Sequence, residues 1–244
     1  YTPFIPAAKR MNAKIKRDID PVNNDGITLI PQAMSIVADE VIDLHRQLVP
    51  YGYDEINVNL GCPSGTVVSK KRGSGILAYP DMLDSFLDEL YTKADFPVSI
   101  KTRVGFNDDE LWPKLIEIYS KYPISELTMH PRVQKDFYKN TPRMDDFALA
   151  VQKINPDKTI LCYNGDITDA NSFKALTDRF PDIDEIMIGR GLFANPALIT
   201  ELKGISMDKA ELCERLKNWH DEILSGYLSI FSGVSATPSI IPST

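Results

Sequence analysis

The stretch EINVNLGCP at residues 55–63 decides the fold, because it predicts a β-strand that ends in a turn carrying a lone thiol. Apolar side chains alternate with Asn57 and Asn59, so one face of the strand is apolar and the other carries amides. We expect the apolar face to pack on a core. The amide face then looks into a polar space, and Cys62 follows where the strand ends.

Runs of strand-forming residues recur along the chain, at residues 2–7, 27–33, 55–60, 97–104, 126–130, 159–164 and 185–189. Apolar residues at helical spacing lie between most of them and predict helices over residues 37–48, 83–90, 111–118, 147–154 and 173–180. Pro80 and Pro142 stand where helices can begin, and Thr168 can cap one. This alternation predicts an α/β protein built from repeated β-α units.

Polar residues occupy the last inward-facing positions of most of these strands, namely Gln32, Asn59, Lys101, Arg103, His130, Arg132, Asn164, Asp166 and Arg190. A doubly wound open sheet would concentrate ligand contacts at one switch point, whereas a barrel brings side chains from many strands to one mouth. We therefore favour a (β/α)8 TIM-type barrel. The pattern accounts for seven strands where closure needs eight, so one strand is missing or unrecognised.

The composition predicts a single-domain enzyme in a reducing compartment. The chain has 244 residues, 43% of them hydrophobic, which is enough for one large domain with a buried core. Cys62, Cys162 and Cys213 are too widely spaced for a disulfide framework or a zinc site. The net charge of −7 argues against a nucleic-acid binder that uses its whole surface, although basic residues cluster between Lys9 and Arg17. We expect a cytoplasmic monomer with no metal and no membrane association.

The last two strand ends predict a phosphate site. Asn164-Gly165-Asp166 and Gly189-Arg190-Gly191 follow strands that would be the seventh and eighth of a barrel, where barrels commonly bind phosphate. Glycine lets the backbone approach an anion closely, and Arg190 offers a fork of donors that suits phosphate oxygens.

Together these motifs resemble the tRNA-dihydrouridine synthases, flavin enzymes built on a barrel. The resemblance runs from residue 1 to about residue 198 and is most specific in NLGCP at residues 59–63 with GSGIL at residues 73–77. Supporting elements are Gln32, KTR at residues 101–103, HPR at 130–132 with Tyr138, NGD at 164–166 and GRG at 189–191.

The resemblance implies a reaction in which NADPH reduces bound FMN and the flavin then passes hydride to C6 of a uracil ring in tRNA. Cys62 would donate a proton to C5, which a thiol protonated at neutral pH is able to do. A mobile loop carrying Cys62 would close over the flipped base, with Gly73 and Gly75 providing freedom near its far end. Lys70, Lys71 and Arg72 on that loop would contact tRNA phosphates.

The resemblance also implies the remaining site residues. The cofactor contacts would be Gln32, Lys101, His130, Asn164, Gly165, Asp166, Gly189 and Arg190. Asn59 and Arg132 would lie near the substrate base or the flavin. Lys101 has a physical rationale, because a cation beside the N1 and O2 edge stabilises the negative charge of a reduced flavin.

The chain departs from the family pattern at both ends. The family begins with a β-α unit that this sequence lacks, so we expect an N-terminally incomplete FMN-binding barrel over residues 1–200. An abbreviated helical segment and tail would follow over residues 201–244, with about one helix at residues 207–227. Two other functions stay open: an FMN-barrel oxidoreductase acting on a small pyrimidine or enone, as dihydroorotate dehydrogenases do, and a cofactor-free RNA-binding remnant.

Overall fold

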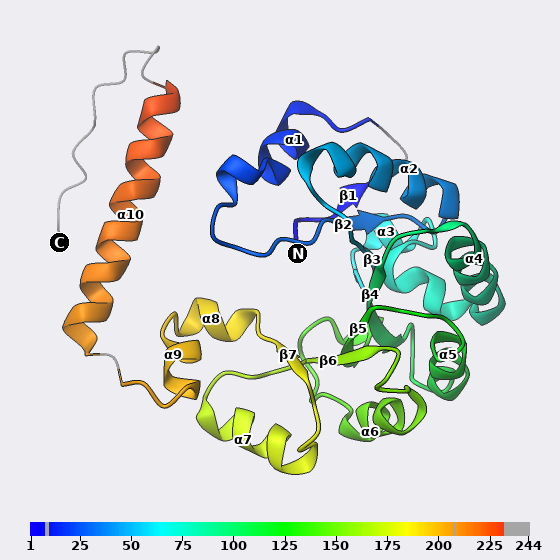
Figure 1. The fold of residues 1–244 in the computed structure, drawn as a ribbon. Helices are drawn as coiled ribbons and strands as arrows, with labels where there is room; N and C mark the ends of the chain where they lie inside the picture. Colours follow the sequence, from blue (N-terminus) through cyan, green and yellow to red (C-terminus); the bar gives the residue numbers. More distant parts are fainter. Residues whose placement is uncertain (8–9, 207, 232–244) are drawn as a thin grey trace. The chain divides into compact units, whose positions relative to one another are not determined.

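The structure is a computed structural model that describes residues 1–7, 10–206 and 208–231, and it is an α/β protein (Figure 1). Its seven-stranded sheet has the order β1-β2-β3-β4-β5-β6-β7, and every pairing is parallel. The strands are β1 (Ile5–Pro6), β2 (Gln32–Met34), β3 (Ile56–Leu60), β4 (Val98–Gly105), β5 (Glu126–Val133), β6 (Ile160–Asn164) and β7 (Glu185–Met187). Each of the seven predicted strands overlaps one of these, although β2 begins at Gln32 where the prediction spanned residues 27–33.

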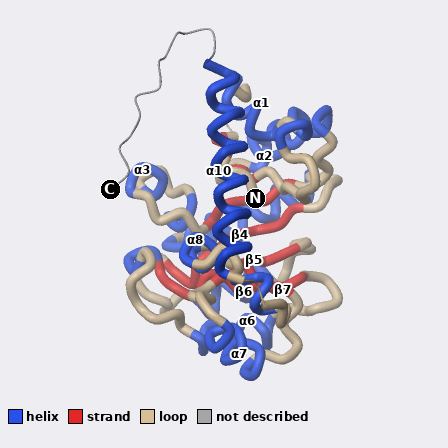
Figure 2. The backbone as a smooth tube through the Cα atoms, turned by 90° about the vertical axis from the view of Figure 1, so that its left-hand side faces the viewer, coloured by secondary structure: helices blue, strands red, loops and turns tan. Residues whose placement is uncertain are grey.

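Each strand pairs with the next strand in the chain, which is the order of a (β/α) barrel. Among the described residues no pairing joins β7 to β1, so the sheet is a partial barrel that is open between these strands. Figure 2 shows β4, β5, β6 and β7 following one another across the sheet. The predicted fold class is confirmed.

Helices cover the outer face of the sheet and bury its apolar side chains. Figure 1 shows α2 (Ala38–Leu48), α4 (Pro80–Lys93), α5 (Trp112–Tyr119) and α6 (Met144–Lys153) in succession along that face. Val58, Ile100 and Met129 are fully buried beneath them. Pro80 occupies the first turn of α4, as predicted, because its missing N–H has no partner at that position in any helix.

The register places the polar residues of neighbouring strands side by side on the other face. Asn59 lies opposite Lys101, Lys101 lies opposite Thr128, and Arg103 lies opposite His130. Because the carboxyl ends of parallel strands share one edge, this register gathers the predicted site residues of the central strands at one place.

Several short elements lie outside the predicted pattern. They are α1 (Ala13–Ile19), α3 (Gly65–Val68) and the 3-10 turns Pro21–Asn23, Val49–Tyr51, Gly73–Ala78 and Gln134–Asp136. Asn12 caps the start of α1, since its side chain accepts a hydrogen bond from the amide of Ile15 at 2.9 Å. The basic cluster near the start thus lies partly on a helix, and Lys9 falls outside the described residues.

The chain divides into two compact units. The first comprises Tyr1–Asp166 and Ala175–Ile188, and the second comprises Ile167–Lys174 and the chain from Gly189 onward. α7 (Ala170–Arg179) has residues in both, and the second unit also contains α8 (Arg190–Ala194), α9 (Leu198–Leu202) and α10 (Lys209–Phe231). The predicted helix at residues 207–227 corresponds to α10, while Met207 and the predicted tail from Ser232 lie outside the described residues.

Two details of the chain beyond β6 concern helices. Thr168 is not the residue that caps α7: Asp169 accepts the hydrogen bond from the amide of Ser172, at 2.7 Å. The cap of α7 is therefore the carboxylate of Asp169 and not the hydroxyl of Thr168, the residue before it.

None of the helices in the described ranges combines the length and apolar character that crossing a membrane would require.

Candidate active site

The turn that carries Cys62 is held by hydrogen bonds to its backbone. The side-chain oxygen of Asn59 accepts from the amides of Gly61 at 3.1 Å and Cys62 at 2.9 Å. The carbonyl of Cys62 accepts from the amide of Ser74 at 3.1 Å and from its hydroxyl at 2.9 Å. Asn59, which was predicted to contact substrate or flavin, here shapes the turn that presents the thiol.

Two side chains from other strand ends complete the support of this turn. The Arg103 Nε donates to the carbonyl of Gly61 at 3.0 Å, and Gln134 Nε2 donates to the carbonyl of Pro63 at 2.9 Å. Cys62 itself is a free, half-buried cysteine. Its backbone position is therefore determined by side chains from β3, β4 and two separate turns.

Gly73 and Gly75 are packing positions in this structure, although the sequence predicted them to give a loop its freedom. Both are buried. A Cβ at Gly73 would lie 2.7 Å from the Cys62 carbonyl oxygen, and one at Gly75 would lie 2.8 Å from the Val68 carbonyl oxygen. The absence of a side chain is what lets this segment pass against the Cys62 turn.

Replacing Gly73 with alanine is expected to destabilise the protein by at least about 2 kcal/mol, because it adds a steric clash to backbone strain at φ +54°. Urea unfolding measures the loss. The matched control is Gly52→Ala, which has φ +87° and no atom within 4 Å of the added Cβ, so it reports the strain alone. Equal losses in the two variants would contradict the packing role.

Amide side chains form a buried chain of hydrogen bonds beside the turn. Gln32 donates to Asn57 at 2.8 Å, and its own oxygen accepts from Asn59 at 2.6 Å. Asn57 donates to Ser99 at 3.0 Å. Gln32, predicted as a flavin contact, is thus connected to Cys62 through Asn59.

Lys101 is a largely desolvated cation with a neutral partner. Its Nζ donates to the side-chain oxygen of Asn164 at 2.5 Å, and Asn164 in turn donates to the carbonyl of Met187 at 2.9 Å. Burial, followed by repulsion from Arg103, lowers the pKa of Lys101 to about 8. Within the described part of the chain Lys101 forms no ion pair. Binding of an electron-rich group beside its ammonium would therefore be favourable.

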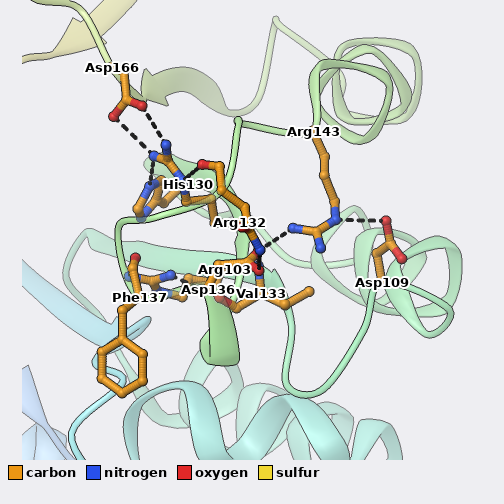
Figure 3. A network of polar contacts seen from close by, with 10 residues as sticks. Arg103, Asp109, His130, Arg132, Val133, Asp136, Phe137, Arg143 and Asp166 are labelled. Carbon is orange, nitrogen blue, oxygen red and sulfur yellow. Dashed lines mark hydrogen bonds and ion pairs between the residues drawn. The ribbon is translucent and has the colours of Figure 1, made fainter.

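His130, Arg132 and Asp166 meet in one cluster at the ends of β5 and β6 (Figure 3). The Arg132 guanidinium binds both carboxylate oxygens of Asp166, one of them at 3.0 Å, and lies 3.0 Å from His130 Nε2. Because a guanidinium only donates, His130 Nε2 is the acceptor in this hydrogen bond. Three predicted site residues are therefore brought together, and Arg132 is 1% exposed.

Arg103 was not predicted as a site residue, yet it ties three loops together. In addition to Gly61 it binds the carbonyls of Val133 at 3.0 Å and Phe137 at 2.8 Å (Figure 3). Burial lowers its pKa, but an arginine keeps its charge at any physiological pH. The sequence did contain a signal for Arg103 as a site residue, because it follows Lys101 by two positions and so lies on the same face of the strand.

Asp136 anchors the turn after β5. Its carboxylate accepts from the amide of Val133 at 3.1 Å and pairs with Arg143, which also binds Asp109 at 3.1 Å (Figure 3). Burial opposes the charge of Asp136, but the bonds from Arg143 and Asn140 outweigh burial and lower its pKa. The carbonyl of Asn140 in turn accepts from Arg132 Nε at 2.5 Å.

The basic residues after the Cys62 turn have different surroundings. Lys70 is exposed. The Nζ of Lys71 lies 4.3 Å from the ring centroid of Tyr79, and Arg72 pairs with Glu40 at 3.3 Å. Two of the three residues predicted to contact phosphate thus already have partners within the protein.

The predicted phosphate cradle is spread over the two units. Gly165 belongs to the first unit, and a Cβ there would lie 2.0 Å from the Tyr163 hydroxyl oxygen, so its lack of a side chain serves packing. Gly189 and Arg190 belong to the second unit, where Gly189 precedes α8 and has open space around its Cα. Their part in a cofactor site remains a prediction.

Glu126, Cys162 and Glu185 form a separate cluster at the amino-terminal half of β5 to β7. Their ligand atoms lie within 4.8 Å of one another, as in a site for a metal ion. The hydroxyl of Tyr1 donates to Glu126 at 2.7 Å, and burial with repulsion from Glu126 raises the pKa of Glu185. The sequence predicted no metal, and this stays a prediction.

Comparison with known proteins agrees with this arrangement of strands and motifs. Residues 1–224 match the sequence profile of the family described as Dihydrouridine synthase (Dus). A "Probable tRNA-dihydrouridine synthase" of Staphylococcus aureus is 33% identical over 154 residues, which are 62% of this chain and 46% of that protein. The "tRNA-dihydrouridine synthase B" of Pasteurella multocida is 30% identical over 168 residues, 68% of this chain and 49% of that protein. The chain thus spans about half the length of the curated relatives it matches. It belongs to the dihydrouridine synthase family.

Proposed function

We propose that this protein takes part in the reduction of uridine to 5,6-dihydrouridine in tRNA, with FMN as cofactor and NADPH as reductant. The names of its relatives support the substrate. The observation that carries the proposal is the turn at Cys62, where Asn59, Ser74, Arg103 and Gln134 hold the backbone on either side of a free thiol. This turn follows β3, which pairs with the strand that carries Lys101.

The residues present suit a flavin. Lys101 has an ammonium whose described partner is a neutral amide, and the polar face of the sheet also offers Gln32, His130 and Asn164 as hydrogen-bonding groups. When bound, FMN would supply the hydride for C6 of the uracil ring. Gly165, Asp166, Gly189 and Arg190 are proposed to bind its ribityl and phosphate groups.

Cys62 is proposed to donate the proton that reaches C5 of the base. A general acid must be placed within reach of the atom it protonates, and the bonds to Gly61, Cys62 and Pro63 fix the backbone that carries the thiol. Asn59 and Arg132 are proposed to lie near the base. The basic group proposed to contact tRNA phosphates consists of Lys70 and Lys71, which are exposed, and the half-buried Arg72.

An anaerobic visible spectrum tests the proposal. The protein is loaded with FMN, reduced with NADPH and mixed with tRNA that lacks dihydrouridine. Return of the oxidised flavin band, with dihydrouridine found in the tRNA, is the expected result. A flavin that stays reduced in the presence of tRNA would contradict the proposed substrate, and failure to bind FMN would contradict the proposed cofactor.

A second function is favoured by one observation. Arg72 is engaged with Glu40 and Lys71 with Tyr79, so much of the loop charge is satisfied without a nucleic acid. An FMN-dependent oxidoreductase acting on a small pyrimidine or enone would not need that charge. Reoxidation of the reduced flavin by a small substrate but not by tRNA would select this alternative.

A further inference from the structure

Phe137 has an unusual backbone conformation on the surface of the protein. Its φ is +51°, a positive value that a bulky residue rarely adopts, and the residue is 45% exposed. Burial of the ring does not explain the conformation. Strained residues of this kind persist where the surrounding structure enforces them, and they gather at functional sites.

The surrounding bonds enforce this conformation. The amide of Phe137 donates to the carbonyl of Gln134 at 3.1 Å, and its carbonyl accepts from Arg103 at 2.8 Å. Asp136, immediately before it, is anchored by Arg143. Figure 3 shows the ring of Phe137 pointing away from this polar network.

The same groups connect Phe137 to the turn of the proposed acid. One guanidinium, that of Arg103, binds both the Phe137 carbonyl and the Gly61 carbonyl. Gln134, in the same turn, binds the carbonyl of Pro63. The backbone of the Phe137 turn is therefore connected, through Arg103 and Gln134, to the backbone on either side of Cys62.

The neighbouring aromatic residue is turned differently. The ring of Tyr138 lies 5.6 Å from the Arg103 guanidinium and 6.0 Å from the His130 ring. Among the described residues no ring stacks on that of Phe137. Phe137 thus keeps a ring face for an external partner.

Two lysines flank Phe137 and give the surface its charge. Lys135 and Lys139 are exposed, and neither forms an ion pair with any described residue. By contrast, Lys93, Lys114 and Lys121 each pair with an aspartate. On a chain of net charge −7, an exposed ring between two unpaired cations is the combination that single-stranded nucleic acids bind.

We propose that Phe137 stacks on a base next to the target uridine, while Lys135 and Lys139 contact the phosphates beside it. This rests on the proposed function, which it deepens by naming a residue that grips the RNA flanking the reaction site. Stacking would hold the strand while the target base leaves its own stack, because each base offers a π-face that an aromatic ring can match.

The test is binding of fluorescently labelled, unmodified tRNA to the FMN-loaded protein, measured by anisotropy. Phe137→Gly suits the left-handed φ, so it should fold at least as well as the wild type and lose only the ring. We expect about tenfold weaker binding for Phe137→Gly and Phe137→Leu, and affinity close to wild type for Phe137→Trp. The matched control is Phe193→Ala, which removes an exposed ring of the second unit and should leave binding unchanged.

The salt dependence of binding tests the two lysines. Lys135→Ala and Lys139→Ala should each lower the slope of log affinity against log salt by about 0.7, the value for one contact to a single strand. Unchanged slopes, or equal affinity of the wild type and Phe137→Gly, would overturn the proposal.

The outcomes separate this proposal from the proposed function. Ring-dependent binding by a protein that reduces no uridine would support the stacking surface and contradict the activity. Reduction of tRNA by Phe137→Gly with unchanged KM would support the activity and contradict the stacking surface. No binding of tRNA by the wild type would overturn the stacking surface, while flavin reduction by NADPH in the same sample reports separately on the cofactor site.

Discussion

Replacing Cys62 with alanine is expected to lower the rate of tRNA uridine reduction by about 10²- to 10⁴-fold, the usual contribution of a general acid. The reason is that the thiol supplies the C5 proton, while the backbone bonds from Asn59 and Ser74 do not involve the thiol and survive the substitution. Single-turnover reoxidation of the reduced flavin by tRNA measures this step apart from flavin reduction by NADPH.

The other cysteines provide the controls for this result. Cys162→Ala and Cys213→Ala should retain activity, since one thiol lies on β6 and the other on α10. FMN reduction and tRNA affinity of Cys62→Ala should stay within about twofold of the wild type. A parallel loss of tRNA binding would sink the acid role and assign Cys62 a structural one.

Replacing Lys101 with methionine is expected to stabilise the cofactor-free protein and to weaken FMN binding at the same time. Burial lowers the pKa of Lys101 from 10.5 to about 8, which corresponds to a destabilisation of up to roughly 3 kcal/mol at neutral pH. Methionine fills similar space without a charge. Loss of the charged donor should weaken FMN binding by on the order of tenfold to a hundredfold.

The pH dependence provides an independent check on Lys101. Below pH 8 the folded and unfolded chains both carry the proton, so the full penalty applies. Between about pH 8 and 10.5 the folded protein releases that proton first, and wild-type stability from this group rises with pH. The advantage of Lys101→Met in thermal unfolding should therefore shrink across this range. A constant advantage would show that packing rather than charge is responsible.

The sequence predicted the sheet well because period-two alternation and burial have the same cause. Asn57 and Asn59 alternate with apolar residues, and the structure places the two sets on opposite faces. The same alternation predicts that Lys101, Asn164 and His130 lie on the polar face of the sheet. Strand ends were less predictable, since β5 continues to Val133 where Arg103 and Asp136 bind its backbone.

The supports of the site could not be predicted in the same way. Arg103 binds carbonyls rather than acids, and backbone carbonyls carry no sequence signal. Gln134 reaches Pro63 across 71 positions of the chain. Gly73 was interpreted as a source of freedom because a glycine in sequence does not distinguish flexibility from close packing, and only the 2.7 Å approach to Cys62 decides between them.

The chain-order pairing of the sheet bears on how the protein is made. Each strand finds its hydrogen-bonding partner in the strand synthesised immediately before it, so no strand from β2 to β7 must wait for a distant segment. The sheet can therefore lengthen one strand at a time as the chain leaves the ribosome. Cys62, Lys101 and the Arg103 bonds to Gly61 lie within the first half of that growth, so the thiol turn can take shape before α6 and the strands after it exist.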